Sequence, residues 1–184
     1  MEALTDNALM LKVRSGDIDK LGLLYERHKR NLFGFFYNMS RDSHTSEDMV
    51  QTVFIRMLKY KHTFTGTGSF GAWMYKMARN VYYDHFKKLS RNGTKHELSQ
   101  IHLKDEDVES PEEHLYVEET RYQLNTAISR LSPKKREVLL LCKYRGLKFS
   151  EVGEVLGCSE GAAKVKAHRA LQELRTIFFE LEKR

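Results

Sequence analysis

One stretch decides the fold: Leu147-Lys-Phe-Ser-Glu-Val-Gly-Glu-Val-Leu156-Gly157-Cys-Ser-Glu-Gly-Ala-Ala-Lys-Val-Lys166-Ala-His168-Arg169-Ala170. It predicts a short apolar-periodic helix that ends at Gly157 and a second helix that begins after Ser159, a good N-cap residue. The second helix has small and apolar residues on one face and basic residues on the other: Ala163, Ala167, Ala170, Leu171 and Leu174 against Lys164, Lys166, His168 and Arg169. Small residues let two helices approach closely, and a basic outer face suits a phosphate-lined major groove. The stretch predicts a DNA-binding helix-turn-helix, with an ordinary helical hairpin and a solvated basic face as the alternative.

The composition favours an all-α protein with acidic partners. The chain has 184 residues, only 2 prolines and 41% hydrophobic residues, and its formal net charge is +6. Between Lys104 and Glu119, eight acidic residues stand against one lysine, so the rest of the chain is more basic than the mean. A basic balance favours nucleic acid as a partner.

No segment predicts secretion or membrane insertion. The N-terminus lacks a basic region followed by an apolar core, and no apolar run approaches a membrane-spanning length. Cys142 and Cys158 lie within apolar helical patterns and are expected to be buried free thiols of a cytoplasmic protein.

Two helical blocks are expected on either side of a polar connector. The first block extends over residues 1–89, a flexible acidic linker over 90–110, and the second block over 111–184. Within the second block, Pro111 opens one helix and Ser132-Pro133 opens the next, which Gly146 ends. The predicted fold is therefore two small all-α domains joined by a flexible linker.

The predicted helix from Phe70 to Leu89 combines an apolar stripe with a basic and aromatic outer face. That outer face contains Lys76, Arg79, Asn80, Tyr83, Asp84, Lys87 and Lys88. Cations neutralise phosphates, rings stack on unpaired bases, and Asn can read a base edge, so the face suits a single DNA strand. The alternative is that the tyrosines complete the core and the lysines are merely solvated.

The helix from Ser46 to Lys59 has a second face opposite its core. This face consists of Asp48, Gln51, Thr52, Ile55 and Lys59. One apolar residue in a polar stripe indicates a protein partner, although a single exposed Ile is common.

Enzymatic chemistry has no support in the sequence. The His residues form no His-Glu-x-x-His pattern, the cysteines form no Zn spacing, and Gly66-Thr-Gly68 is too short to cradle a phosphate. We therefore expect no catalysis, no cofactor and no metal.

Taken together, these motifs resemble a sigma factor of bacterial RNA polymerase, of the extracytoplasmic function (ECF) type within the sigma-seventy family. The segment from Ser46 to Leu58 resembles the polymerase-binding helix of that family, and the segment from Phe70 to Lys87 resembles its promoter-melting helix. Leu131-Ser-Pro-Lys-Lys-Arg-Glu-Val-Leu139 and the helix-turn-helix resemble region four. Two motifs in the family's order make the resemblance specific.

The resemblance implies a transcription initiation factor with three sets of contact residues. Those expected to bind core polymerase, at the beta-prime clamp, are Asp48, Gln51, Thr52, Ile55 and Arg56. Those expected at the melted minus-ten element are Phe70, Trp73, Lys76, Arg79, Asn80, Tyr83 and Asp84, with the loop over residues 63–69. Those expected at the minus-thirty-five element are Lys164, Val165, Lys166, His168 and Arg169. The beta flap, promoter DNA and an anti-sigma factor are the other implied partners.

Three residues depart from the family pattern. Gly153 stands where Ala is common, Ala163 where Val or Ile is usual, and Val165 where ECF factors often have Ser. The first two are expected to loosen packing, and the third to alter which promoter sequence is read. The alternative function is a stand-alone helix-turn-helix regulator, which has no need for a basic and aromatic strand-binding face.

Overall fold

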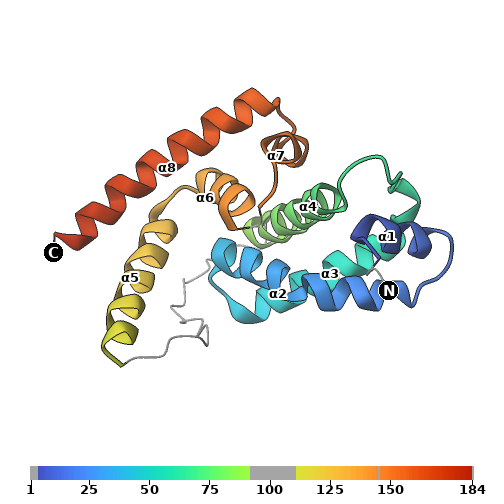
Figure 1. Ribbon diagram of the computed structural model, residues 1–184, viewed down its shortest axis with the longest axis horizontal. Helices are drawn as coiled ribbons and strands as arrows, with labels where there is room; N and C mark the ends of the chain where they lie inside the picture. The colour runs from blue at the N-terminus through green and yellow to red at the C-terminus, as the bar shows by residue number, and fades with distance from the viewer. Residues whose placement is uncertain (1–3, 92–110, 145, 184) are drawn as a thin grey trace.

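The computed structural model describes residues 4–91, 111–144 and 146–183, and in this part of the chain all regular secondary structure is helical (Figure 1). Its elements are α1 (Asp6–Arg14), α2 (Lys20–Ser40), α3 (Ser43–Lys59), η1 (Lys61–Thr63), α4 (Phe70–Arg91), α5 (Pro111–Arg130), α6 (Pro133–Leu139), η2 (Leu140–Tyr144), α7 (Phe149–Leu156) and α8 (Glu160–Glu182). The all-α prediction is confirmed. The linker is predicted over residues 90–110, and its part beyond Arg91 lies outside the described residues.

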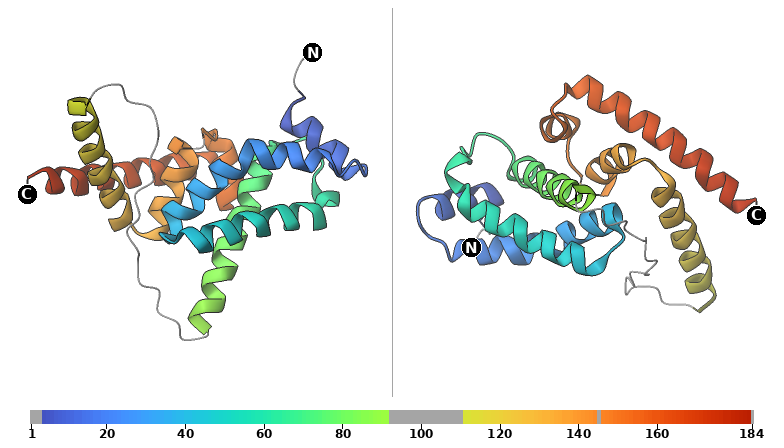
Figure 2. Two further views of the ribbon diagram at one scale, coloured as in Figure 1. Left: turned by 90° about the horizontal axis from the view of Figure 1, so that it is seen from below. Right: turned by 180° about the vertical axis from the view of Figure 1, so that it is seen from behind.

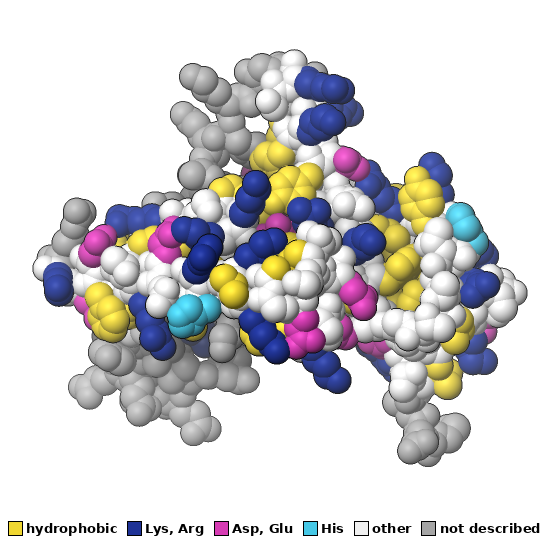
Figure 3. Space-filling view, turned by 90° about the horizontal axis from the view of Figure 1, so that it is seen from above, with side chains coloured by type: hydrophobic (Ala, Val, Ile, Leu, Met, Phe, Trp, Pro, Cys, Tyr) yellow, Lys and Arg dark blue, Asp and Glu magenta, His cyan; other side chains and the backbone are white. Residues whose placement is uncertain are grey.

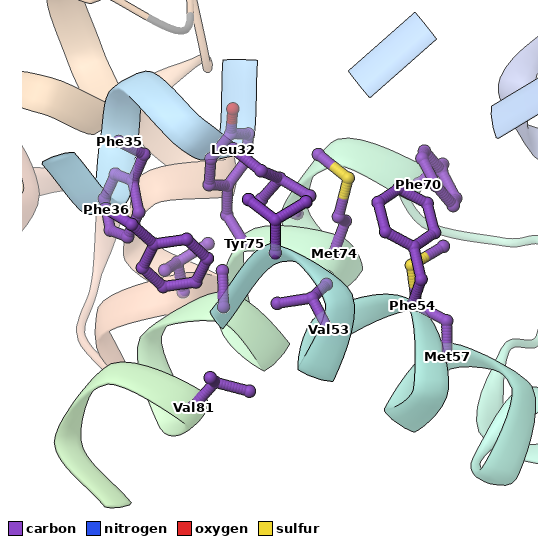
Figure 4. Close-up of a cluster of buried hydrophobic side chains, with 14 of the residues drawn as sticks. Leu32, Phe35, Phe36, Val53, Phe54, Met57, Phe70, Met74, Tyr75 and Val81 are labelled. Atoms are coloured by element: carbon purple, nitrogen blue, oxygen red, sulfur yellow. The ribbon is translucent and has the colours of Figure 1, made fainter. Parts of the chain in front are cut away.

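The first four helices form one bundle around an aromatic and Met-rich core. α3 packs against both α2 and α4, and α1 packs against α2 (Figure 1). Phe35, Phe54 and Met74, from α2, α3 and α4 respectively, belong to one buried cluster that extends along the bundle (Figure 4). The apolar stripes at three- and four-residue spacing place these side chains on the inner faces. The last turns of α4 extend beyond the bundle (Figure 2).

The remaining helices contain the predicted helix-turn-helix, formed by α7 and α8. Gly157 ends α7 with a positive φ of 67°, a conformation that glycine adopts without steric cost. The Ser159 hydroxyl accepts from the Ala162 N–H and so caps α8, as predicted. Ser132 precedes α6 as predicted, but its side chain makes no capping hydrogen bond.

The two blocks are not separate in space. Leu140, Leu141, Val152 and Val155 belong to the same buried apolar cluster as the core of the first bundle. α7 packs directly against α4, and α6 packs against the end of α2 (Figure 1). Cys142 and Cys158 are free thiols at the edge of this cluster, half-buried rather than fully buried. α6 and α7 therefore pack on two sides, against the first bundle and against α8.

Gly153 tightens the helix-turn-helix instead of loosening it. A Cβ on this residue would lie 2.6 Å from the carbonyl oxygen of Cys158, a distance that real Cβ atoms do not adopt. The Gly153 carbonyl also accepts hydrogen bonds from the N–H groups of Gly157 and Cys158. The expectation that this glycine loosens packing is wrong, because the turn passes so close to α7 that no side chain fits. Ala163 is fully buried in the same core.

Gly153→Ala is therefore expected to destabilise the protein, although alanine is the better helix former. The backbone clash forces the turn away from α7, at a cost of about 1–3 kcal/mol, the usual penalty of overpacking. Thermal unfolding followed by circular dichroism measures the effect, with Gly161→Ala as the control, because a Cβ there meets nothing within 4 Å. An unchanged melting temperature for Gly153→Ala would contradict the close approach.

Candidate nucleic-acid interface

The outer face of α8 is open to solvent along its first half. Lys164, Lys166, His168 and Arg169 are all exposed, and Val165 is 50% exposed between them. Lys164 forms an ion pair with Glu160, one turn earlier, at 2.6 Å. Lys and Arg side chains are spread over the face of the molecule shown in Figure 3. The first half of α8 presents the exposed basic surface that a helix needs to enter a major groove.

The outer face of α4 divides into a free part and a covered part. Lys76 and Asn80 are exposed, as are Lys87 and Lys88 nearer the end of the helix. Phe70 is only 2% exposed, and Trp73 is half-buried and donates from its Nε1 to the Thr63 hydroxyl over 3.3 Å. In this arrangement Phe70 supports the core, whereas Lys76 and Asn80 are open to a ligand.

The covered part of α4 faces a buried carboxylate from α6. Glu137 is 2% exposed, and its side chain forms an ion pair with the Arg79 guanidinium at 3.0 Å. The Tyr83 hydroxyl donates to the same carboxylate over 3.1 Å, and the Arg79 guanidinium lies 5.0 Å from the centre of the Tyr83 ring. We call these three residues the Glu137 cluster. Two residues expected at DNA are thus engaged by the other half of the chain.

Burial sets the protonation behaviour of the Glu137 cluster. Loss of solvent raises the pKa of the Glu137 carboxyl above its ordinary value, although Arg79 and the hydrogen bond from Tyr83 oppose that shift. Burial and the neighbouring carboxylate raise the pKa of Tyr83 to about 12. The phenol therefore stays protonated at neutral pH and acts as a hydrogen-bond donor.

The neighbouring residue, Arg136, makes the main polar contact between the two halves. Its buried guanidinium donates to the carbonyl oxygens of Ile128, Ser129 and Leu131, at the end of α5. It also donates to the Met39 carbonyl in the last turn of α2 over 3.1 Å. Carbonyls in the last turn of a helix lack intrahelical partners, and a cation there is favourable. Arg136 therefore joins the ends of two helices from different halves of the chain.

Sequence reasoning did not single out Arg136 or Glu137 as site residues. The segment Pro133-Lys-Lys-Arg-Glu137 is polar, and its charged residues are typical of an exposed first turn of a helix. One feature of the sequence could have indicated their burial. Arg136 and Glu137 come directly before the apolar run Val138–Leu141, and this position places them at the edge of a buried face.

The stripe on α3 lies on the surface of the first bundle. Ile55 is 67% exposed, and Asp48 and Gln51 are exposed beside it. Arg56 turns towards α4 and forms an ion pair with Asp84 at 2.8 Å. Two residues expected at different partners, polymerase and DNA, therefore pair with each other, and their ion pair joins the two surfaces.

Comparison with known proteins shows the family of this chain. Family models match in both halves of the chain: Sigma-70 region 2 over residues 24–92 and Sigma-70, region 4 over residues 121–174. The chain is 31% identical over 178 residues to the ECF RNA polymerase sigma factor BldN of Streptomyces coelicolor, covering 94% of this chain and 67% of that protein. The chain belongs to the sigma-70 family and is an ECF sigma factor. It directs promoter recognition in transcription initiation.

Two solved structures share the fold of this sigma factor. CnrH, in a structure with the cytosolic domain of CnrY, matches with a TM-score of 0.70 and 21% identity, over 95% of this chain and 97% of that one. The sigma factor RpoE from Bartonella quintana, in complex with the anti-sigma factor NepR, matches with a TM-score of 0.70 and 20% identity, over 85% of this chain and 94% of that one. At these identities the likeness concerns the fold.

Within the described ranges, His, Cys, Asp and Glu side chains form no group that could hold a metal ion. No helix of the described part has the length and apolar character needed to cross a bilayer.

Glu137→Lys is expected to separate the two halves of the sigma factor. The substitution places an ammonium group against Arg79, so the former attraction becomes a repulsion in a site with little solvent. The expected cost to the packed arrangement is about 1–3 kcal/mol, below that of a fully buried pair because Arg79 is partly exposed.

Small-angle X-ray scattering measures the separation as an increase in the radius of gyration. Glu154→Lys is the matched control, since it makes the same charge change at an exposed position of α7. If both variants scatter as the wild type does, the Glu137 cluster does not hold the halves together.

Proposed function

We propose that the two halves of this sigma factor act as two DNA-reading modules, residues 1–89 and 111–184, joined by the linker over residues 90–110. The observation that carries this proposal is the presence of two basic helical faces, on α4 and on α8, that belong to different halves. A regulator that binds only duplex DNA needs the basic face on α8 but not the one on α4. We further propose that the protein has no catalytic activity of its own and works in the cytoplasm.

The α8 face is proposed to enter the major groove of the minus-thirty-five element. Residues near the start of a recognition helix reach base edges, whereas more distal cations meet phosphates. Lys164 and Val165 lie in the first two turns and are exposed, as base-reading residues must be. Lys166, His168 and Arg169 complete the proposed contact surface.

The α4 face is proposed to hold the unpaired minus-ten strand. Lys76 and Asn80 are exposed one turn apart, and Tyr83 follows on the same face. Base stacking on a ring and a polar contact to a base edge require bases that are not paired, so this face acts after melting. The loop expected over residues 63–69 begins at Phe64, since Thr63 belongs to η1, and this loop before α4 is proposed to take part in the same contact.

Both faces cannot occupy a promoter in the packed arrangement. The two elements are about 25 base pairs apart, or about 85 Å at about 3.4 Å per step. α7 packs against both α4 and α8, and two successive helix packings separate axes by only about 20 Å. We therefore propose that promoter binding requires the halves to separate, which releases Arg79 and Tyr83 from Glu137.

The α3 stripe is proposed to bind core polymerase at the beta-prime clamp, through Asp48, Gln51, Thr52, Ile55 and Arg56, while the second module contacts the beta flap. Ile55 is the large apolar side chain that a protein partner would bury at the centre of such a surface. An anti-sigma factor is the other proposed partner, because the structurally similar RpoE is bound by NepR.

Ile55→Glu is expected to weaken binding to core polymerase at least about tenfold, because it buries an unpaired charge in the interface. Fluorescence anisotropy of the labelled sigma factor titrated with core polymerase measures the affinity. Leu58→Glu, at a less exposed position one turn further, tests how far the surface extends. Wild-type affinity of Ile55→Glu would place the polymerase-binding surface elsewhere.

Different residues of the recognition helix, α8, are expected to set sequence preference and overall DNA affinity. Lys164→Ala and His168→Ala change the preferred minus-thirty-five sequence, because losing a good base contact costs about 1–3 kcal/mol at one base pair. Arg175 is an exposed cation further along α8, and Arg175→Ala lowers activity on every sequence and reduces the salt dependence. Transcription from a library randomised over the upstream element checks this. Equal losses on all sequences in all three variants would mean that α8 reads no bases.

A stand-alone regulator is the competing function, and one comparison separates the two. A sigma factor supports specific transcription in vitro only with core polymerase and binds promoter duplex poorly by itself. Tight binding of the purified protein to duplex promoter DNA, together with no transcription after addition of core polymerase, would favour the regulator.

A further inference from the structure

The loop between η1 and α4 is held by side chains of α1. The loop contains two glycines, and Gly66 has a positive φ of 80°, so its backbone has few intrinsic restraints. The hydroxyls of Thr65 and Thr67 lie 2.8 Å apart, and both residues are exposed. A loop of this composition needs external contacts to keep one conformation.

Asn7 supplies three of these contacts with a single side chain. Its Nδ2 donates to the carbonyl oxygen of Gly68 over 2.8 Å and to that of Gly66 over 3.4 Å. Its Oδ1 accepts from the backbone N–H of Phe70 over 2.9 Å, and Phe70 is the first residue of α4. The amide thus caps α4 and fixes the preceding loop at the same time. A carboxylate could not replace it, because it has no donor for the two carbonyls, and a hydroxyl has only one donor for both of them.

Two further residues of α1 act on the same segment. The Arg14 guanidinium donates to the Phe64 carbonyl over 3.0 Å. The Leu11 side chain lies against Gly66, close enough that a Cβ there would approach it to 3.0 Å. Asn7, Leu11 and Arg14 follow one another at spacings of four and three residues, so they share one face of α1. We call this face the α1 brace.

We propose that the α1 brace positions the loop over residues 64–69 and thereby sets the base preference of this sigma factor at the minus-ten element. The brace contacts the loop backbone, while the side chains of Thr65 and Thr67 hydrogen-bond to each other and stay exposed, where a base can reach them. Asn7 is therefore a positioning residue that acts through the loop. This inference rests on the proposed function of the loop in holding the unpaired strand.

Asn7→Asp separates the two roles of the Asn7 side chain, which are to cap α4 and to hold the preceding loop. The carboxylate keeps an acceptor for the Phe70 N–H and places a negative charge at the N-terminus of α4, which favours the helix. It also sets an oxygen against the carbonyls of Gly66 and Gly68, so the loop loses its donors. The folded state should keep its stability while the loop changes its position.

The experiment measures open-complex formation by the holoenzyme on templates randomised over the minus-ten element. Asn7→Asp and Asn7→Ala are compared with Lys12→Ala, because Lys12 is exposed and helical spacing places it outside the face that Asn7, Leu11 and Arg14 share. We expect both Asn7 variants to change the ratio of preferred to disfavoured bases by about two- to tenfold, the range that follows from the typical net value of a hydrogen bond. Core binding and the melting temperature of Asn7→Asp should match those of Lys12→Ala.

Thr67→Ala distinguishes the failure of this inference from the failure of the proposed function. If Thr67→Ala changes base preference and the Asn7 variants do not, the loop reads the strand without the brace and the inference is wrong. If the Asn7 variants lower activity by the same factor on every template, Asn7 only supports the fold, and the inference is also wrong. If Thr67→Ala leaves the base preference unchanged as well, the loop does not contact the strand, and both proposals fail.

Discussion

The buried guanidinium of Arg136 is the constraint on which the packed arrangement depends. A charge taken out of water is costly unless it is fully hydrogen-bonded, and Arg136 meets this condition through carbonyl oxygens from both halves of the chain. Burial lowers the pKa of the guanidinium, yet arginine stays charged at any physiological pH. Removing either set of carbonyls leaves part of this charge unsatisfied, so the end of α2 and the end of α5 are held to the same point on α6.

The residue that follows Arg136 connects this constraint to the DNA-facing surface. Glu137 lies one position along α6 and pairs with Arg79 and Tyr83 of α4. The same short helix therefore both fastens the two halves together and covers part of the strand-binding face. Burial raises the pKa of Glu137, so the packed form holds its proton more tightly than a solvated carboxyl does. The packed form consequently gains stability, relative to the separated form, as pH falls from neutral towards the ordinary pKa of Glu.

Several elements were predictable because their signals are local. The stop at Gly157, the cap at Ser159 and the small residues Ala163 and Ala167 on the inner face of α8 depend only on backbone conformation and helical spacing. The exposure of Ile55 was predictable for the same reason, since it lies opposite the apolar stripe of its own helix. The interpretation of Gly153 was wrong, because helix propensity ignores the turn that passes 2.6 Å from its missing Cβ.

The sequence by itself determined the helix-turn-helix with its stop at Gly157 and its cap at Ser159, the apolar faces of the main helices and the membership of the sigma-70 family. Each follows from residues close together in the chain or from motifs in a fixed order. Only the tertiary structure decided which helix faces contact one another and which side chains pair between them. It placed Glu137 on Arg79, Arg56 on Asp84 and Asn7 on the loop before α4. These pairs join residues about 30 to 60 positions apart, and no local pattern encodes them. A charged or amide side chain on a helix face has many possible partners, and the partner is chosen by packing of the apolar faces behind it.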